Sequence, residues 1–243
     1  MPSISNALLP PSEIRYSAHA LLSFLFPRRV IPDAEIPAKK QIIGTPCFQL
    51  IEHLGAERAS VEKFISQRFA ESFGSRVEAF MPRLFTLRNQ DGDICGAFGL
   101  RSANHKLFLE QYLDAPIEKI IASRTGSKVE RRTVVEIGHF SGTFPGAVRA
   151  MIGLLTERLH RESFEWVSFT GTSSLRNAFC RLGLSPINIQ AAEANRLPAT
   201  QRAAWGTYYD HAPQVLVGNI LEGYGALHSQ NLPYVLPQRV SNT

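Results

Sequence analysis

The first candidates for chemistry are two side chains of one short, mostly apolar stretch, VVEIGHFSG, which spans residues 134–142. A carboxylate inside an apolar strand is rarely left unpaired, so Glu136 either meets a cation or faces a cavity. In a cavity it would be a candidate general base. The cations that could instead pair with it structurally are Arg76, Arg83 and Arg101.

His139 follows Glu136 in the same stretch, at an odd spacing. In a regular strand the two side chains would therefore point to opposite faces. A β-bulge at Gly138 would bring both to one side, because a bulge inserts an extra residue into the alternation. His139 is then a candidate second base.

The loop after this stretch, SGTFPGA, predicts an anion site at a helix N-terminus. Pro145 is favourable at the first helical position, and the two glycines of the loop permit close approach of a ligand to the backbone. An ordinary capped helix is the alternative. The residues that would contact a phosphate are Ser141, Gly142, Thr143, Gly146, Ala147 and Arg149.

Two further segments concentrate polar and aromatic groups. Tyr208, Tyr209, Asp210 and His211 form the densest polar cluster, either as part of a site or as a turn lock before a proline. The stretch LFLEQY, residues 107–112, predicts a strand.

In such a strand Glu110 would lie between Phe108 and Tyr112 on one face, because strand side chains alternate. This arrangement suggests a pocket for a cationic or polar acceptor, or else an exposed face with aromatic cover. We expect Asp114 to cap the helix that follows.

Composition excludes several classes of function. A net charge of +5 favours acidic partners such as phosphorylated cofactors or carrier proteins, and no dense basic run interleaved with aromatics predicts nucleic-acid binding. The 3 cysteines and 7 histidines show no metal-ligand spacing and no disulfide framework, which suits a cytoplasmic protein. We expect Cys180 to be packed inside a helix. There is no transmembrane run and no G-x-S-x-G hydrolase motif.

The elements that must position these groups centre on a βαβα unit, residues 134–184. Its helix, 145–160, is long enough to connect two parallel strands, which can splay apart rather than pair along their whole length. Its second helix ends at Gly183. The other predicted elements are strands at 48–51, 187–191 and 214–217, a helix capped by Ser60 at 60–73, a hairpin of 84–88 and 94–100, a helix at 116–123 and a polar loop at 196–203.

Prolines divide the chain into three parts. Residues 1–45 predict an extension with a short helix, 12–26, which could serve as an arm in a homodimer. Residues 46–223 form the main domain, and residues 224–243 predict an irregular tail.

This order of elements resembles the GCN5-related N-acetyltransferase (GNAT) fold. That is an α/β fold with a mixed, mostly antiparallel sheet, flanking helices and a central splayed pair of parallel strands. The segment SSLRNAFCRLGL, residues 173–184, is similar to the GNAT segment that ends in Tyr-x-x-x-Gly-Phe. Phe179 stands at the tyrosine position and Leu184 at the phenylalanine position. The resemblance adds Arg176 and Asn177 to the candidate cofactor-binding residues.

From about residue 76 to 223 the chain resembles the thermostable hemolysin family. The resemblance is carried by LFLEQYLDAPIE, VVEIGHFSG, WVSFTGTSSLRNAFCRLGL and WGTYYDHAPQV. That family is GNAT-like and distantly similar to acyl-homoserine-lactone synthases, which use an acyl carrier protein as donor carrier. The residues EIGHF, 136–140, resemble the glutamate-bearing strand of those synthases.

The resemblance implies an acyltransferase of secondary metabolism. The donor would be acyl-CoA or a phosphopantetheinyl acyl carrier protein, acting as a co-substrate rather than a tightly bound cofactor, and the acceptor a small-molecule amine. Glu136 would deprotonate the amine. Because Phe179 replaces the usual general acid, Tyr208 or Tyr209 would protonate the leaving thiolate. Acceptor contacts would come from Glu110, Tyr112, Asp210 and His211.

Two other functions stay open at this point. Pro145 and Phe179 depart from the GNAT pattern and would suit a non-catalytic binding module in a biosynthetic complex. The family name suggests a membrane-active protein, for which residues 18–29 are the only amphipathic candidate.

Overall fold

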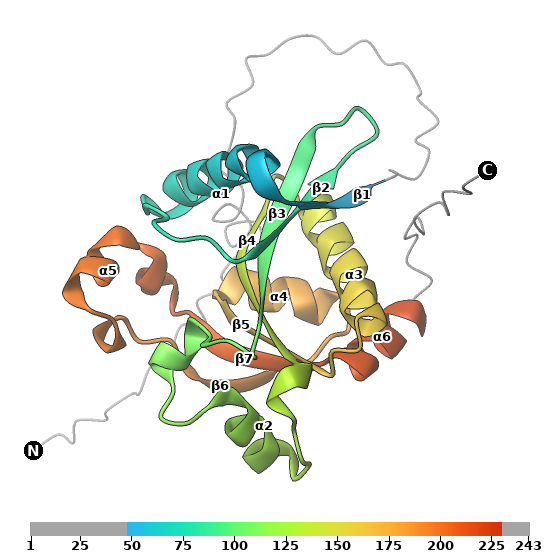
Figure 1. Ribbon diagram of the computed structural model, residues 1–243, viewed down its shortest axis with the longest axis vertical. Helices are drawn as coiled ribbons and strands as arrows, with labels where there is room; N and C mark the ends of the chain where they lie inside the picture. Colours follow the sequence, from blue (N-terminus) through green and yellow to red (C-terminus); the bar gives the residue numbers. More distant parts are fainter. Residues whose placement is uncertain (1–47, 230–243) are drawn as a thin grey trace, which may run out of the picture.

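A twisted seven-stranded sheet crosses the middle of the protein in the computed structural model, which describes residues 48–229 (Figure 1). The strand order is β1-β2-β3-β4-β5-β7-β6. Neighbours are antiparallel except for the pair β4 and β5, which is parallel. This confirms the predicted mixed, mostly antiparallel class. The strands are β1 Gln49–His53, β2 Arg83–Arg88, β3 Ile94–Ser102, β4 Val134–Gly142, β5 Trp166–Gly171, β6 Ile187–Ala191 and β7 Gln214–Asn219.

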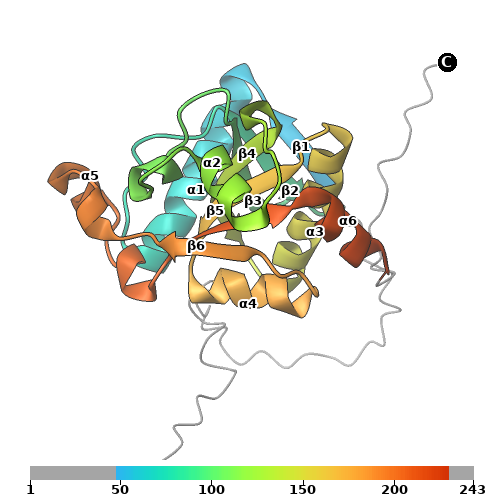
Figure 2. The ribbon, with the colours of Figure 1, turned by 90° about the horizontal axis from the view of Figure 1, so that it is seen from below.

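Helices cover both faces of the sheet (Figure 2). One face carries α3 Pro145–Arg161, α4 Ser173–Arg181 and α6 Ile220–Ser229. The other carries α1 Arg58–Phe73 and α2 Ile117–Thr125, and α5 Ala199–Ala204 lies at the rim of the molecule. The short 3₁₀ turns are η1 Gly55–Glu57, η2 Leu109–Tyr112, η3 Arg131–Thr133, η4 Ala194–Arg196 and η5 Tyr208–His211.

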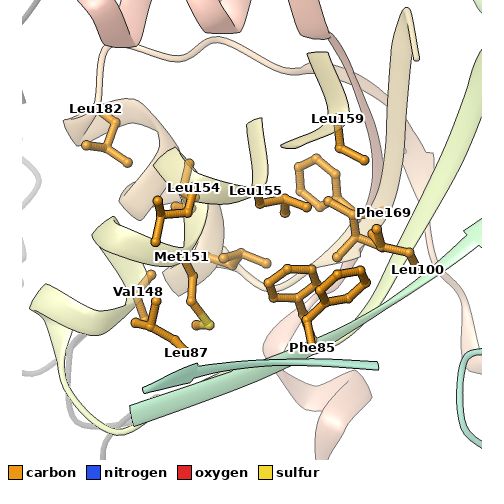
Figure 3. Close-up of a cluster of buried hydrophobic side chains, with 14 of the residues drawn as sticks. Phe85, Leu87, Leu100, Val148, Met151, Leu154, Leu155, Leu159, Phe169 and Leu182 are labelled. Atoms are coloured by element: carbon orange, nitrogen blue, oxygen red, sulfur yellow. The ribbon is translucent and has the colours of Figure 1, made fainter. Parts of the chain in front are cut away.

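Strand alternation divides the core between the two faces. In β2, Phe85 and Leu87 face the helix α3, whereas Leu84, the residue before Phe85, packs on the α1 side. Figure 3 shows Leu87 beside Val148 and Met151 of α3, with Phe85 in the same cluster. Burial of side chains of this size stabilises the fold by about 1.5–3 kcal/mol each. The sheet is therefore a rigid platform between two packed layers.

Local sequence signals place most element ends where we expect them. Helix α1 ends at Gly74, whose φ of 62° is left-handed, and Gly183 closes the α4 segment with a φ of 66°. The hairpin of β2 and β3 turns at Gly92, and Pro145 opens α3. Short-range sequence rules were enough to predict the ends of these elements.

The stretch 107–112 is not a strand, and this prediction is wrong. Carboxylates accept three of its backbone N–H groups: Glu110 accepts that of Leu107, and Glu136 accepts those of Phe108 and Leu109. The segment therefore folds as the 3₁₀ turn η2, and β3 pairs directly with β4.

Several smaller expectations also need correction. Asp114 does not cap α2: it pairs with Arg196 at 2.6 Å, and Pro116 is the cap residue. Ser60 lies inside α1, which begins at Arg58. Cys180 is exposed rather than packed.

Two segments expected to be irregular contain helices. The polar region 196–203 includes most of α5, and residues 224–229 continue α6 into the expected tail. Residues 1–47, with the predicted arm at 12–26 and the amphipathic candidate at 18–29, lie outside the described residues, as do residues 230–243. Among the helices of residues 48–229, none is long and apolar enough to cross a membrane.

Candidate active site

The central feature of the site is a gap between the two parallel strands. The pairing of β4 with β5 runs from Val134 opposite Trp166 to Ile137 opposite Phe169 and then stops, although both strands continue. The predicted splay is thus present. A cavity of about 340 Å³ occupies the gap, with Gly138, His139 and Phe140 on one side and Thr170 on the other.

The cavity passes from one face of the sheet to the other. On the α1 side its walls include Phe69, Trp205 and Tyr208, and on the α4 side they include Leu175 and Phe179. Polar groups gather on the first side and apolar ones on the second. A molecule with a polar reacting end and an apolar remainder fits this division.

A β-bulge brings His139 to the same side of β4 as Glu136, which is the second of the two arrangements that the sequence left open. Gly99 pairs with Gly138 and Ala97 with Ser141, so that one residue of β3 opposes two of β4. His139 has a φ of 56°, the left-handed conformation that such bulges use. Both Glu136 and His139 consequently line the same cavity.

Glu136 is 3% exposed and holds the start of η2. Its Oε2 accepts the N–H of Phe108 at 2.8 Å and its Oε1 that of Leu109 at 2.9 Å. Burial nevertheless raises the pKa of this carboxyl to about 7, because desolvation outweighs the two hydrogen bonds. The group can therefore exchange a proton near neutral pH.

The alternative of a structural ion pair for Glu136 is wrong within the described residues. Arg83 binds Glu52 and Glu162 instead, both at 2.7 Å, and Arg76 binds the exposed Glu78. Arg101 donates to the carbonyl of Lys106 at 3.3 Å. Among residues 48–229, the hydrogen bonds of Glu136 therefore come from backbone N–H groups.

His139 is held as a neutral ring. The backbone N–H of Met81 donates to its Nε2 at 3.2 Å, so the neutral tautomer carries its hydrogen on Nδ1. Burial lowers the pKa of His139 to about 4. The Nδ1 atom is buried and has no hydrogen-bond partner in the part of the chain described.

Two tyrosines line the polar wall, and a third lies behind one of them. Tyr208 lines the cavity and donates to the carbonyl of Thr170 at 3.5 Å. Tyr112 also lines it, and its hydroxyl is 2.6 Å from that of Tyr209, which lies behind it. Burial raises the pKa of all three hydroxyls, so each stays protonated at neutral pH.

Most of the predicted acceptor contacts lie elsewhere. Glu110 forms an ion pair with Arg131 at 2.6 Å and fixes η2 from outside the cavity. Asp210 is exposed, and the ring of His211 packs on Phe73 with centroids 5.4 Å apart. Neither lines the cavity. Of the four residues predicted for the acceptor, the structure brings only Tyr112 to it.

The predicted anion loop has few free donors. The N–H and the hydroxyl of Thr143 both donate to the carbonyl of Cys95 at 2.9 Å, and the N–H of Ala147 donates to Phe144. The hydroxyl of Ser141 is buried against the carbonyl of Ala97. The amides of Thr143 and Ala147 are thus already bound to backbone carbonyls.

Three further candidates for phosphate contact have polar side chains. Arg149 and Asn177 are exposed, and Arg176 donates to Ser173 and to the carbonyl of Ala212. None of the candidates for phosphate binding lines either cavity. Their role remains a prediction.

A second cavity of about 200 Å³ adjoins the first on the α3, α4 and α6 side. Its lining is mostly apolar and includes Leu155, Leu159 and Leu184. The two cavities share Ile137, Phe169 and Phe179. Sequence reasoning missed this space, because these positions read as ordinary core.

A match to a family profile establishes the family of the chain. The profile of the thermostable hemolysin family matches residues 51–224. The chain belongs to this family. None of the curated proteins compared with this thermostable hemolysin family member matches it significantly.

Solved structures similar to this family member share its fold. TofI in an apo form has a TM-score of 0.53 at 16% identity, covering 74% of this chain and 96% of TofI. The AHL synthase LasI has a TM-score of 0.52 at 11% identity, covering 80% of this chain and 99% of LasI. FeeM, an N-acyl amino acid synthase from uncultured soil microbes, has a TM-score of 0.53 at 12% identity, covering 77% and 99%.

Proposed function

We propose that this thermostable hemolysin family member is an acyltransferase that moves an acyl group from a thioester to an amine. The observation that carries the proposal is Glu136, a buried carboxyl with a pKa raised to about 7, placed at the gap between two splayed strands. Structures of this fold that are described as synthases of acylated products support the same reaction class.

The donor would lie across the gap. Its thioester would sit between Gly138 of β4 and Thr170 of β5, where strand pairing has ended and backbone groups can bind a linear arm. The acyl chain would extend past Phe179 toward the second, apolar cavity. Acyl-CoA and an acyl carrier protein both present this kind of thioester.

The side chains of the polar wall would carry out the proton transfers of the reaction. Glu136 would take a proton from the amine nitrogen as that nitrogen attacks the thioester carbonyl. The carbon–sulfur bond breaks, the thiolate leaves, and Tyr112 would give it a proton through the hydroxyl pair that Tyr112 forms with Tyr209. Tyr208 is the second candidate for this acid role.

His139 has a different role in this scheme. Its Nε2 already accepts the N–H of Met81, so the ring has no free nitrogen to act as a base. We assign it as a neutral hydrogen-bond donor through Nδ1. The base of the reaction is then Glu136 alone.

The test is release of free thiol from acyl-CoA and acyl carrier protein donors, with acyl chains from two to sixteen carbons and a panel of amines. We expect thiol release that Glu136→Gln lowers at least about tenfold. Glu118→Gln is the matched control, because Glu118 pairs with Arg131 away from the cavity. Donor binding without thiol release would support the non-catalytic module instead. No binding of any donor would overturn the proposal.

A further inference from the structure

Arg101 and Glu136 lie directly opposite each other in the register of β3 and β4. Opposite charges at such positions are normally close enough to interact, because the side chains project from the same face. Both residues line the larger cavity. Within residues 48–229 they nevertheless form no ion pair with each other.

Each of the two groups is held by backbone instead. Glu136 is turned toward the N–H groups of Phe108 and Leu109, and Arg101 toward the carbonyl of Lys106. Their charges still act on each other, since the positive charge of Arg101 lowers the pKa of Glu136 against the effect of burial. A cation and an anion thus face one cavity, separated from each other.

Arg101 is the arginine of this cavity that has no carboxylate partner among the described residues. The other arginine of the lining, Arg76, is bound to Glu78, and their side chains are 80% and 51% exposed. A guanidinium presents several N–H donors in a planar fork that matches a carboxylate. The guanidinium of Arg101 therefore offers N–H donors to an anion at the polar wall of the cavity.

From this separated pair we infer that the acceptor is an α-amino acid, with its carboxylate on Arg101 and its amino group at Glu136. The inference rests on the proposed acyl transfer and narrows its acceptor. An α-amino acid carries its two charges one carbon apart, so a single small molecule can bridge two residues that are cross-strand neighbours. The same contact would present the nitrogen to the base Glu136.

The sharpest test compares acceptors that differ only in the carboxylate. Each of the standard amino acids is assayed for thiol release beside its methyl ester and its decarboxylated amine. We expect at least one amino acid to exceed both analogues about tenfold or more in kcat/KM, the scale of a lost charge-assisted hydrogen-bonded pair. Equal rates with acid, ester and amine would overturn the inference and leave acyl transfer intact.

Variants test whether Arg101 is the residue that causes the preference for the acid over the ester. Arg101→Gln is expected to abolish the preference for the acid over the ester, while Arg101→Lys retains part of it. Arg76→Gln is the matched control at the same cavity and should keep the full preference. If Arg101→Gln lowers the rates with acid and ester equally, or if Arg76→Gln also removes the preference, the assignment to Arg101 is wrong.

Binding of reaction products separates this inference from the proposed function. N-octanoyl amino acids and their methyl esters are titrated by calorimetry, which needs no turnover. Wild type should bind at least one acid about tenfold more tightly than its ester, and Arg101→Gln should bind both alike. No acid binding more tightly than its ester would overturn the inference. Tighter acid binding without any thiol release would support the carboxylate site and reject the acyltransferase.

Discussion

The ring of Phe179 stacks on that of Phe169 with centroids 4.9 Å apart, and the two rings form a wall common to both cavities. Phe179 stands where the GNAT pattern has a tyrosine, so this position carries an apolar ring in place of an acidic hydroxyl. The ring acts as a partition between the two cavities. In the proposed reaction the partition lies across the path of a long acyl chain.

Shortening Phe179 should therefore change the acyl chain that the protein prefers. Phe179→Leu joins the two cavities, and we expect the preferred chain to lengthen by about two to four carbons, at roughly 0.8 kcal/mol for each newly buried CH₂. The measurement is kcat/KM for thiol release across acyl-CoA chain lengths.

Phe164→Leu is the control for loss of an aromatic ring from the same core cluster without touching either cavity. It should keep the wild-type chain preference. An unchanged preference in Phe179→Leu would mean that the acyl chain takes another path.

The raised pKa of Glu136 predicts a rate that depends on pH near neutrality. A general base must be ionised, so kcat/KM should rise with pH through an apparent pKa of about 7 and level off above it. In Glu136→Gln the residual rate should lack this limb. A wild-type profile that is flat between pH 6 and 8 would exclude Glu136 as the base.

The same carboxyl predicts a change of stability with pH. In the folded protein Glu136 keeps its proton up to about pH 7, whereas in the unfolded chain it loses the proton near 4.5. The folded state therefore holds more protons between these values, and stability falls as pH rises from about 4.5 to 7. Urea unfolding at several pH values should show a smaller decline in Glu136→Gln than in wild type.

The hydroxyl pair of Tyr112 and Tyr209 predicts a leaving-group effect. Tyr112→Phe should lower kcat for a CoA donor at least about tenfold, because the thiolate loses its proton source. A donor with an acidic thiol, such as a 4-nitrothiophenyl thioester of the same acyl group, needs no such proton. The defect should largely disappear with that donor.

Tyr224→Phe supplies the comparison for this prediction, since Tyr224 stacks on His160 beside α6 and lines neither cavity. It should behave as wild type with both donors. An equal loss in Tyr112→Phe with the acidic and the ordinary thiol would contradict the acid role and leave Tyr208 as the candidate.

Sequence patterns sufficed where short-range chemistry decides the structure. Gly74, Pro145 and Gly183 set helix ends by backbone conformation alone, and the strand, helix, strand order predicts the parallel pair. The bulge at Gly138 was one of two arrangements that the sequence left open, and the structure has it. These features needed no knowledge of distant contacts.

The main failures depend on contacts between distant segments. Residues 107–112 alternate like a strand, yet Glu136, far along the chain, takes their N–H groups and bends them into η2. The phosphate-loop hypothesis could not anticipate that the carbonyl of Cys95 accepts the N–H of Thr143. The sequence offered Arg101 as one of three possible cations for Glu136, and only the register of β3 and β4 shows that these two residues lie opposite each other.

Gly206 lies where two walls of the cavity are joined, and we expect its substitution to destabilise the fold. The N–H of Thr207 donates to the carbonyl of Phe73 at 2.8 Å, and that of Arg76 to Ala204 at 2.7 Å, which clamps the segment before η5 onto the end of α1. Gly206 has a φ of 53°, and a Cβ there would lie 2.2 Å from the Phe73 carbonyl oxygen. No backbone oxygen can remain that close.

Gly206→Ala should therefore lower the free energy of unfolding by about 3 kcal/mol, through left-handed strain together with the clash. Gly225→Ala in α6 is the matched control, since a Cβ there meets nothing within 4 Å and alanine favours a helix by up to about 1 kcal/mol. Urea unfolding measures both. Because Ala204 and Trp205 line the cavity, the strained variant should also raise KM for the acceptor. A normal KM in a destabilised Gly206→Ala would show that this clamp supports the fold without shaping the site.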